Sequence, residues 1–205
     1  MERETKNRFM DKFLDKLSGG FFGLISVIIG LTGDFLAYLH IPGYNMFDDM
    51  VSELGVGPGG VFFNLGLIIS GITAIPFYVA LGRVFKEGNF NENVRKGAVG
   101  VALVSTITFS FIGVFPSDET NYPVFLAHGT FALISWLSGM GYMILFGYLM
   151  FKDERFSRYH ASINFMIAGI FVIFLLTWLP LWEWILTFAI TLWIILNSCF
   201  ILHHH

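Results

Sequence analysis

The sequence predicts an all-α, polytopic membrane protein, a bundle of six transmembrane helices with both termini on the cytoplasmic side. Three observations carry this prediction. Of the 205 residues, 55% are hydrophobic and only 13% are charged, against about 25% charged residues in an ordinary soluble domain. Six long runs are nearly free of charge, and Lys and Arg fall only between alternate runs. So little polar surface cannot cover a water-soluble globule, so most of the outside must face lipid.

Each of the six runs is long enough to cross a bilayer as a helix, which needs about 20 apolar residues. The runs lie near 18–40, 60–82, 97–115, 124–151, 162–180 and 184–202. The first run is too long for a signal peptide and no small-residue cleavage site follows it. The runs do not alternate in hydrophobicity as the strands of a membrane barrel do. We therefore expect one six-helix transmembrane domain over residues 18–202.

The basic residues predict the orientation of the bundle. Five lie in the N-terminal tail, four between the second and third runs, and three between the fourth and fifth runs. Together they are all 12 Lys and Arg residues of the chain. Because cytoplasmic loops are enriched in Lys and Arg, we expect a multi-pass protein of the cytoplasmic (plasma) membrane. Its N- and C-termini then lie in the cytoplasm, and its acidic loops face outward.

The two ends of the chain fall outside this predicted domain. Residues 1–17 are expected to form a cytoplasmic amphipathic tail, because Phe9, Phe13 and Leu17 share one helical face opposite charged residues. Such a face favours a helix lying on the membrane surface. The three His residues at 203–205 are interpreted as the remnant of an expression tag. The single cysteine, Cys199, allows no intramolecular disulfide.

The first outer loop is predicted to contain a short amphipathic helix. Its apolar residues at helical spacing are Phe47, Met50, Val51 and Leu54. Gly55 suits a C-terminal stop. The residues on the opposite side are Asp48, Asp49, Ser52 and Glu53. Like charges one helical turn apart repel, so a metal ion, a cationic ligand or simply water must offset the repulsion there.

Two ionisable residues lie inside predicted spans. At a rise of about 1.5 Å per residue, Asp34 lies roughly 9 Å below the outer end of the first helix. His128 lies about 7.5 Å below the outer end of the fourth helix. An ionisable group within a span is costly and indicates a functional site. The alternative is structural: Asp34 caps a helix, accepts a hydroxyl hydrogen bond or is protonated.

The predicted site combines these two residues with polar side chains of the outer loops. The ligand-binding candidates are Asp34, Asp48, Asp49, Ser52, Glu53, Asn64, Ser117, Asp118 and His128. The catalytic candidates are Asp34, Ser52, Asp118 and His128, and the metal candidates are Asp34, Asp118 and His128. Carboxylate oxygens suit a hard divalent cation, which is the candidate cofactor, whereas zinc would need more His or Cys. No metalloprotease, nucleophile-elbow, P-loop or dinucleotide motif is present.

The order of four motifs resembles a known family. The motifs are SELG at 52–55, FFNLGLIISGI at 62–72, FPSD at 115–118 and His128 early in the fourth helix. Over about residues 20–200 the chain resembles the multi-pass membrane family catalogued as domain of unknown function nine-nine-eight. More distantly, it is similar to the six-span membrane proteins grouped with Frag1, DRAM and Sfk1. The resemblance implies six helices and a membrane location but no established reaction. One group of the distant relatives is linked to remodelling of lipid anchors, which favours lipids as ligands.

Three functions stay open at this point. The one that we favour is binding of a lipid or small amphiphile in an outward-facing polar pocket, without chemistry. The second is a metal-dependent lipid hydrolase or transferase, and the third is a transporter of a small solute. Because catalysis requires positioned groups and no catalytic motif is present, we favour a protein that is not an enzyme. We expect membrane lipids as partners and no nucleic acid.

Overall fold

The computed structural model describes residues 19–86 and 90–203, and it is helical without any strand over those ranges. Its elements are α2 (Gly19–Tyr38), the 3-10 helix η1 (Val51–Gly55), α3 (Gly60–Val84), α4 (Glu92–Val114), α5 (Tyr122–Lys152), α6 (Arg158–Thr177) and α7 (Pro180–His203). In these ranges six helices are long and apolar enough to cross a membrane. The predicted six-helix fold is confirmed. The predicted amphipathic tail and most of the interpreted tag lie outside the described residues.

The helices extend beyond the apolar runs where polar residues cap them. Helix α4 begins at Glu92 rather than at 97, because the Asn91 side chain accepts a hydrogen bond from the Asn93 N–H. Ser157 caps α6 in the same way, by accepting from the His160 N–H at 3.1 Å. A side-chain acceptor at this position satisfies an N–H group that the helix itself leaves unpaired. The first turns of both helices therefore lie outside the hydrophobic run.

The six helices form a closed ring. Each helix packs against the next one in the chain, and α7 returns to pack against α2. Gly33 of α2 lies directly against Gly66 of α3, where a side chain on either residue would clash with the facing backbone. Small residues let helices approach closely in lipid, where no hydrophobic force drives them together. Hydropathy alone could not predict this order of neighbours.

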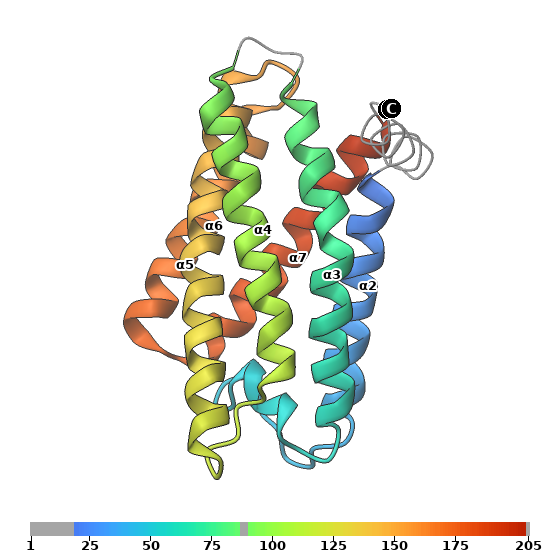
Figure 1. The fold of residues 1–205 in the computed structure, drawn as a ribbon, viewed down its shortest axis with the longest axis vertical. Coiled ribbons are helices and arrows are strands. Elements are labelled where there is room, and N and C mark those ends of the chain that lie inside the picture. Colours follow the sequence, from blue (N-terminus) through green and yellow to red (C-terminus); the bar gives the residue numbers. More distant parts are fainter. Residues whose placement is uncertain (1–18, 87–89, 204–205) are drawn as a thin grey trace, which may run out of the picture.

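The ring has two distinct ends. The basic end carries the α3–α4 and α5–α6 connections and all seven Lys and Arg residues that the structure describes. The acidic end carries the loops 39–59 and 115–121 and the turn between α6 and α7 (Figure 1). The basic residues thus share one end, as the alternating pattern predicted. Which end faces the cytoplasm stays a prediction.

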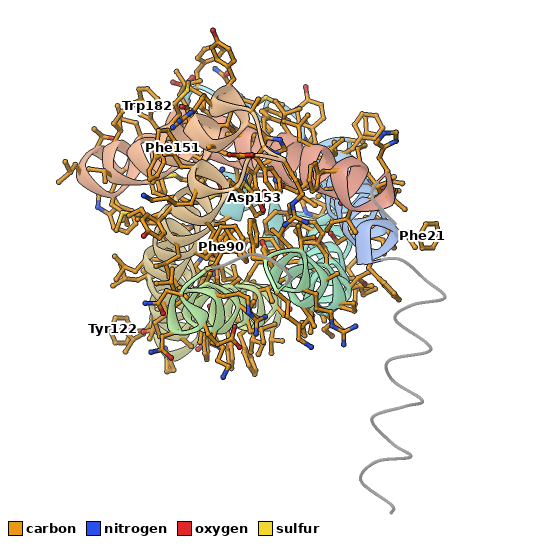
Figure 2. The ribbon with its side chains drawn as sticks, turned by 90° about the horizontal axis from the view of Figure 1, so that it is seen from above. Phe21, Phe90, Tyr122, Phe151, Asp153 and Trp182 are labelled. Carbon is orange, nitrogen blue, oxygen red and sulfur yellow. The ribbon has the colours of Figure 1, made fainter. Side chains whose placement is uncertain are left out.

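A cluster of aromatic rings fills the ring of helices toward the basic end. We call Phe77, Tyr78, Tyr142, Phe146 and Trp193 the aromatic core. Trp193 is fully buried and its ring contacts those of the other four residues. Seen from above the basic end, Phe21 and Phe151 point outward, whereas Asp153 lies toward the middle (Figure 2). Aromatic packing therefore closes this part of the bundle.

The loop between α2 and α3 differs in part from its prediction. A short helix is present, but it is the five-residue η1, and residues 45–49 form turns instead. Val51 and Leu54 are buried as predicted, whereas Phe47 is 68% exposed. Asn45 explains the difference, because its side chain binds Asp48 and the Phe47 N–H, and its backbone N–H donates to Asp49 at 2.7 Å. Such local bonds compete with helix formation.

Candidate functional site

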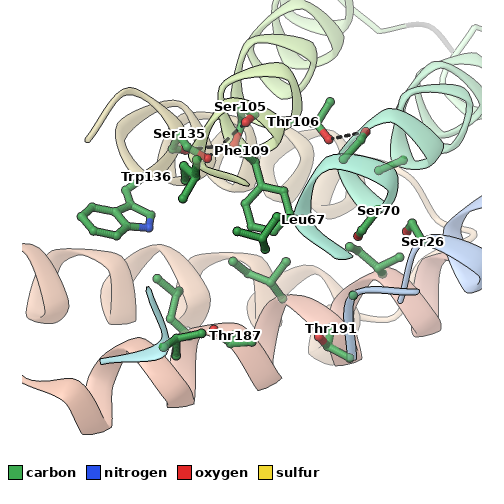
Figure 3. A pocket seen from close by; sticks show the side chains of 18 of the residues that line it. Ser26, Leu67, Ser70, Ser105, Thr106, Phe109, Ser135, Trp136, Thr187 and Thr191 are labelled. Atoms are coloured by element: carbon green, nitrogen blue, oxygen red, sulfur yellow. Dashed lines mark hydrogen bonds between the residues drawn. The ribbon is translucent and has the colours of Figure 1, made fainter. Parts of the chain in front are cut away.

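A cavity of about 170 Å³ lies inside the ring, lined by residues of all six long helices and of η1 (Figure 3). Its carboxyl and imidazole side chains are those of Asp34 of α2, His128 of α5 and Glu183 of α7. Much of the remaining wall is apolar, with Leu67 and Trp136 among the residues seen in Figure 3. The cavity therefore has a small charged region and a larger apolar region.

Asp34 is the least satisfied group of this cavity. Its side chain lines the cavity and the residue is only 9% exposed. Within the described ranges no donor forms a hydrogen bond with its carboxyl group, so neither the capping role nor the hydroxyl bond considered above is found. A buried carboxylate without a partner is costly. A cation or a hydrogen-bond donor in the cavity would remove that cost.

His128 reaches the same cavity from α5. Its Nδ1 lies 2.8 Å from the Phe115 carbonyl oxygen at the end of α4, and the residue is 6% exposed. Because a carbonyl can only accept, Nδ1 carries the proton in this contact. In a neutral ring, Nε2 then keeps its lone pair and can accept a hydrogen bond. Asp34 and His128 thus line the same cavity, and the functional role predicted for them stays a prediction.

Glu183 is a cavity residue that was not among the predicted site residues. It lies in the first turn of α7, and its Oε2 accepts a hydrogen bond from the Val51 N–H at 2.7 Å. Its carboxyl group is also close enough to Asp34 for the two to interact electrostatically. The only sequence signal was an acidic residue at the start of a span. Its partners belong to a loop far away in the chain, which the sequence does not reveal.

The loop 41–59, which we call the covering loop, folds over the acidic end of the cavity. Tyr44 Oη donates to the Met50 carbonyl at 2.7 Å and accepts from Trp184 Nε1 at 3.2 Å. Asn64 Nδ2 donates to the Gly55 carbonyl at 2.9 Å. Burial raises the pKa of Tyr44 above its ordinary value, so its hydroxyl keeps its proton at neutral pH. Side-chain bonds from α3 and α7 thus hold the loop in place.

Figure 1 shows why the loop can reach α7. The α6–α7 turn ends nearer the middle of the bundle than the other connections at the acidic end, and the covering loop occupies the space beyond it. Trp178 ends α6 in a left-handed conformation with φ 52°, and α7 begins at Pro180. The early start of α7 brings Glu183 and Trp184 to the covering loop.

Hydroxyl groups of Ser and Thr residues line the cavity among its apolar side chains (Figure 3). Ser105 Oγ donates to the Ser135 carbonyl at 2.9 Å, and Ser135 Oγ donates back to the Ser105 carbonyl at 3.1 Å. This pair joins α4 to α5. Ser70 and Thr191 also line the cavity, and neither has a hydrogen bond to another described residue. A ligand therefore meets at least these two uncommitted hydroxyls.

Of the nine predicted ligand-binding residues, only Asp34, Ser52 and His128 line the cavity. The other six predicted residues do not line it; they are Asp48, Asp49, Glu53, Asn64, Ser117 and Asp118. Asp118 caps its own loop by accepting from the Thr120 N–H at 3.0 Å and its hydroxyl at 2.6 Å. No group of three His, Cys, Asp or Glu residues able to hold a metal ion occurs in the described part of the chain. The three metal candidates are therefore not assembled into one site.

The comparisons with known proteins give one match. The sequence profile described as "Protein of unknown function (DUF998)" matches residues 24–198. No curated protein and no solved structure matches the chain. The more distant similarity to the Frag1, DRAM and Sfk1 proteins receives no support from these comparisons. The matched range contains every residue that lines the cavity.

Proposed function

The chain belongs to the DUF998 family, which is described as of unknown function, and from this premise we propose that it binds a small amphiphile in the six-helix cavity, without chemistry. The observation that carries the proposal is the Asp34 carboxyl, which has no hydrogen-bond partner among the described residues and lines a mainly apolar cavity beneath the covering loop. A ligand with a polar, hydrogen-bond-donating head and an apolar body suits both parts of that wall.

The size of the cavity supports a small ligand. An apolar cavity of about 150 Å³ accommodates a molecule as large as benzene, and this one measures about 170 Å³. A phospholipid with two acyl chains is several times too large. The proposed ligand is therefore a single-ring or short-chain amphiphile.

The distribution of charge supports an orientation for the ligand. Asp34 and Glu183 contribute two carboxyl groups to the cavity, and Glu183 is already bonded to the covering loop. Asp34 is left to meet the ligand head, so a cationic or donor-rich head is favoured over an anionic one. The body of the ligand then lies against Leu67, Phe109 and Trp136 (Figure 3).

The two alternatives receive less support. A hydrolase needs a nucleophile hydrogen-bonded to a base. Among the described residues Ser52 and His128 do not bond to each other, and the His128 ring bonds to the backbone at the end of α4 instead. A transport path would have to continue to the basic end, where the aromatic core closes the ring around the fully buried Trp193. Neither alternative is favoured by a specific contact.

The test uses three probes of similar size and different charge: benzylamine, benzyl alcohol and benzoate. We expect benzylamine to raise the melting temperature of the detergent-solubilised protein most and benzoate least. Asp34→Asn should abolish the preference for benzylamine, because it removes the charge and leaves the shape of the cavity intact.

Two further variants separate the cavity from the rest of the protein. Thr191→Leu fills part of the cavity and should weaken the response to benzylamine and benzyl alcohol. Thr73→Leu makes the same change in α3 at a residue that does not line the cavity, and it should respond like the natural chain. Equal responses of the two variants, or no response to any probe, would reject the proposed function.

A further inference from the structure

A second cavity lies at the opposite end of the molecule, in a groove between α3 and α4 at the basic end. It has a volume of about 410 Å³ and is lined by two residues of α3, by Lys86 just beyond the end of that helix and by five residues of α4. Four of these eight residues are basic: Arg83, Lys86, Arg95 and Lys96. We propose that this basic groove binds the headgroup of an anionic phospholipid.

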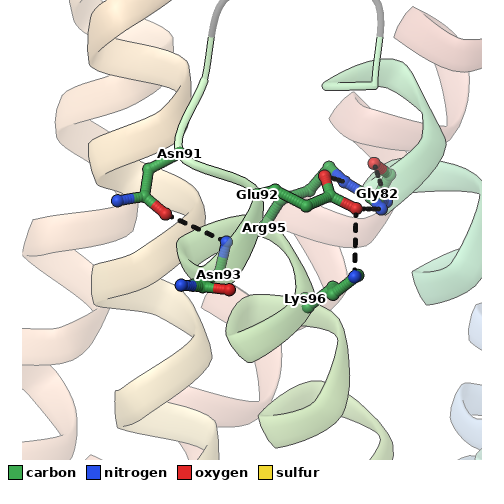
Figure 4. Close-up of polar contacts among 6 residues, drawn as sticks. All are labelled: Gly82, Asn91, Glu92, Asn93, Arg95 and Lys96. Atoms are coloured by element: carbon green, nitrogen blue, oxygen red, sulfur yellow. Dashed lines mark hydrogen bonds and ion pairs between the residues drawn. The ribbon is translucent and has the colours of Figure 1, made fainter.

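Charge carries the first step of the argument. The groove has four basic residues, of which Arg83 is already engaged in a contact of its own. The other three, Lys86, Arg95 and Lys96, face one carboxylate, that of Glu92, which contacts Arg95 and Lys96, so these four residues keep a balance of +2. The Glu92 carboxylate accepts hydrogen bonds from Arg95 Nε at 2.7 Å and from Arg95 Nη2 at 2.6 Å (Figure 4). Its Oε1 also lies 3.5 Å from Lys96 Nζ. One carboxylate cannot neutralise this set. An anion is therefore the ligand that the groove favours.

Arg95 of α4 gives the groove a hydrogen-bond donor that is held in place by a contact with α3. Its Nη1 donates to the Gly82 carbonyl of α3 at 3.2 Å, and its side chain is only 14% exposed (Figure 4). Lys86 and Lys96 are exposed at the rim. A held guanidinium flanked by two solvent-exposed ammonium groups suits the several oxygens of a phosphate.

The apolar floor of the groove favours a lipid over a soluble phosphate. Val79 of α3 and Val99 and Leu103 of α4 line the same groove, and each lies farther from the helix end than the basic residues. The groove therefore changes from cationic to apolar in the direction of the membrane interior. A phospholipid matches this order, because its charged headgroup lies at the membrane surface and its acyl chains extend into the interior. Basic pockets between transmembrane helices are known to bind anionic headgroups.

The glycines give the groove its shape. Gly82 lies so close to Val99 that a side chain there would clash, which keeps α3 and α4 in contact beneath the cations. A Cβ at Gly100, in contrast, would meet no atom within 4 Å. Gly100 therefore leaves open space in the wall of the groove. A larger residue at this position would fill the groove without disturbing the helix packing.

The test measures lipid binding to the detergent-solubilised protein by native mass spectrometry. Dioleoylphosphatidylglycerol, dioleoylphosphatidylcholine and glycerol 3-phosphate are compared at equal concentrations. We expect phosphatidylglycerol to bind at least about tenfold more tightly than phosphatidylcholine, since each surface Lys or Arg adds about fivefold toward an anionic lipid. Glycerol 3-phosphate should bind more weakly than phosphatidylglycerol, because it cannot use the apolar floor.

Two pairs of matched variants locate the site. Lys86→Gln with Lys96→Gln should weaken phosphatidylglycerol binding by about 25-fold, or about fivefold for each lysine. Lys152→Gln with Arg158→Gln removes the same charge from the same end, outside the groove, and should have little effect. Gly100→Leu should weaken binding with no change of charge. Gly169→Leu is its control, because Gly169 is another exposed glycine with open space around it.

Three results would overturn the proposal. Equal affinity for the two phospholipids would show that charge does not select the lipid. Glycerol 3-phosphate binding as tightly as phosphatidylglycerol would identify a soluble anion as the ligand. Equal losses in the groove variants and their controls would indicate general attraction to the basic end. The ligand cavity lies at the other end, so these results are independent of the proposed function.

Discussion

The aromatic core and the ligand cavity lie within one ring of helices but differ in one buried polar group of each, Trp193 in the core and Asp34 in the cavity. In the aromatic core, Trp193 Nε1 donates to Asn164 Oδ1 at 2.8 Å. In the cavity, Asp34 is also buried but has no hydrogen-bond partner among the described residues. Paired polar groups stabilise a packed interior, whereas an unpaired one is costly. The first region thus holds the ring together, and the second stays open for a ligand.

The largest expected effect tests which region carries stability. Trp193→Ala removes a fully buried ring from the aromatic core and should lower the free energy of unfolding by about 3–5 kcal/mol. Trp136→Ala, in the half-buried wall of the cavity, should cost less than half as much. Unfolding in mixed detergent micelles measures both values. Equal losses would show that the two regions do not differ in packing.

A matched pair of enlargements sharpens the same comparison. Ala98 is fully buried in the packed core, whereas Ala74 is buried at the wall of the cavity. Ala98→Leu should lower the free energy of unfolding by about 1–3 kcal/mol, because a packed core has no room for added methylene groups. Ala74→Leu can place its added methylene groups in the cavity, so it should lower the free energy of unfolding much less. A larger loss for Ala74→Leu would mean that the cavity is not available space.

The negative charge of Asp153, at the basic end, should contribute to the free energy of unfolding. Arg155 binds its carboxylate at 2.7 Å and also donates to the Val84 carbonyl at 2.7 Å, which ties the α5–α6 connection to α3. Burial raises the pKa of Asp153, but the hydrogen bonds and charge of Arg155 outweigh burial and bring it below the ordinary 3.8. Asp153→Asn should cost about 1–2 kcal/mol at pH 7.

The sign of the pH dependence follows from that lowered pKa. The folded state holds the Asp153 proton less tightly than the unfolded state does, so the stabilisation is complete above pH 3.8 and is lost as the pH falls through the lowered pKa. The difference in unfolding free energy between Asp153→Asn and the natural chain should therefore shrink below pH 3.8. A difference that stays constant down to pH 2 would contradict the ion pair.

The smallest expected effect concerns Glu53 on the covering loop, where the sign is opposite. Burial raises the pKa of Glu53, and the charges of Asp49 and Glu119 raise it further. The folded state binds this proton more tightly, so the cost of ionisation is absent below pH 4.5 and complete above the raised pKa. Glu53→Gln should increase stability at pH 7 by less than about 0.5 kcal/mol, because solvent screens an exposed carboxylate. Unfolding curves at pH 4 and 7 test this, and a loss of stability at pH 7 would contradict it.

Much of the fold could be predicted because its signals are local. Hydropathy located all six helices, and the basic residues indicated which connections share an end. The site was predicted only in part. Asp34 and His128 stood out because ionisable residues are rare in spans, and both line the cavity. Asp118 has the same carboxylate as Asp34, but groups of its own loop already donate hydrogen bonds to it.

The sequence alone determined the number of spans, their approximate limits and the separation of basic from acidic connections, since these depend on composition along the chain. The tertiary structure decided the order of helices in the ring, the entry of Glu183 into the cavity and the closure of its acidic end by the covering loop. In lipid, an apolar side chain is as favourable against a neighbouring helix as against an acyl chain. Hydrophobicity therefore does not specify how each helix is rotated, and close packing at Gly33 and long-range bonds such as Val51 to Glu183 make that choice.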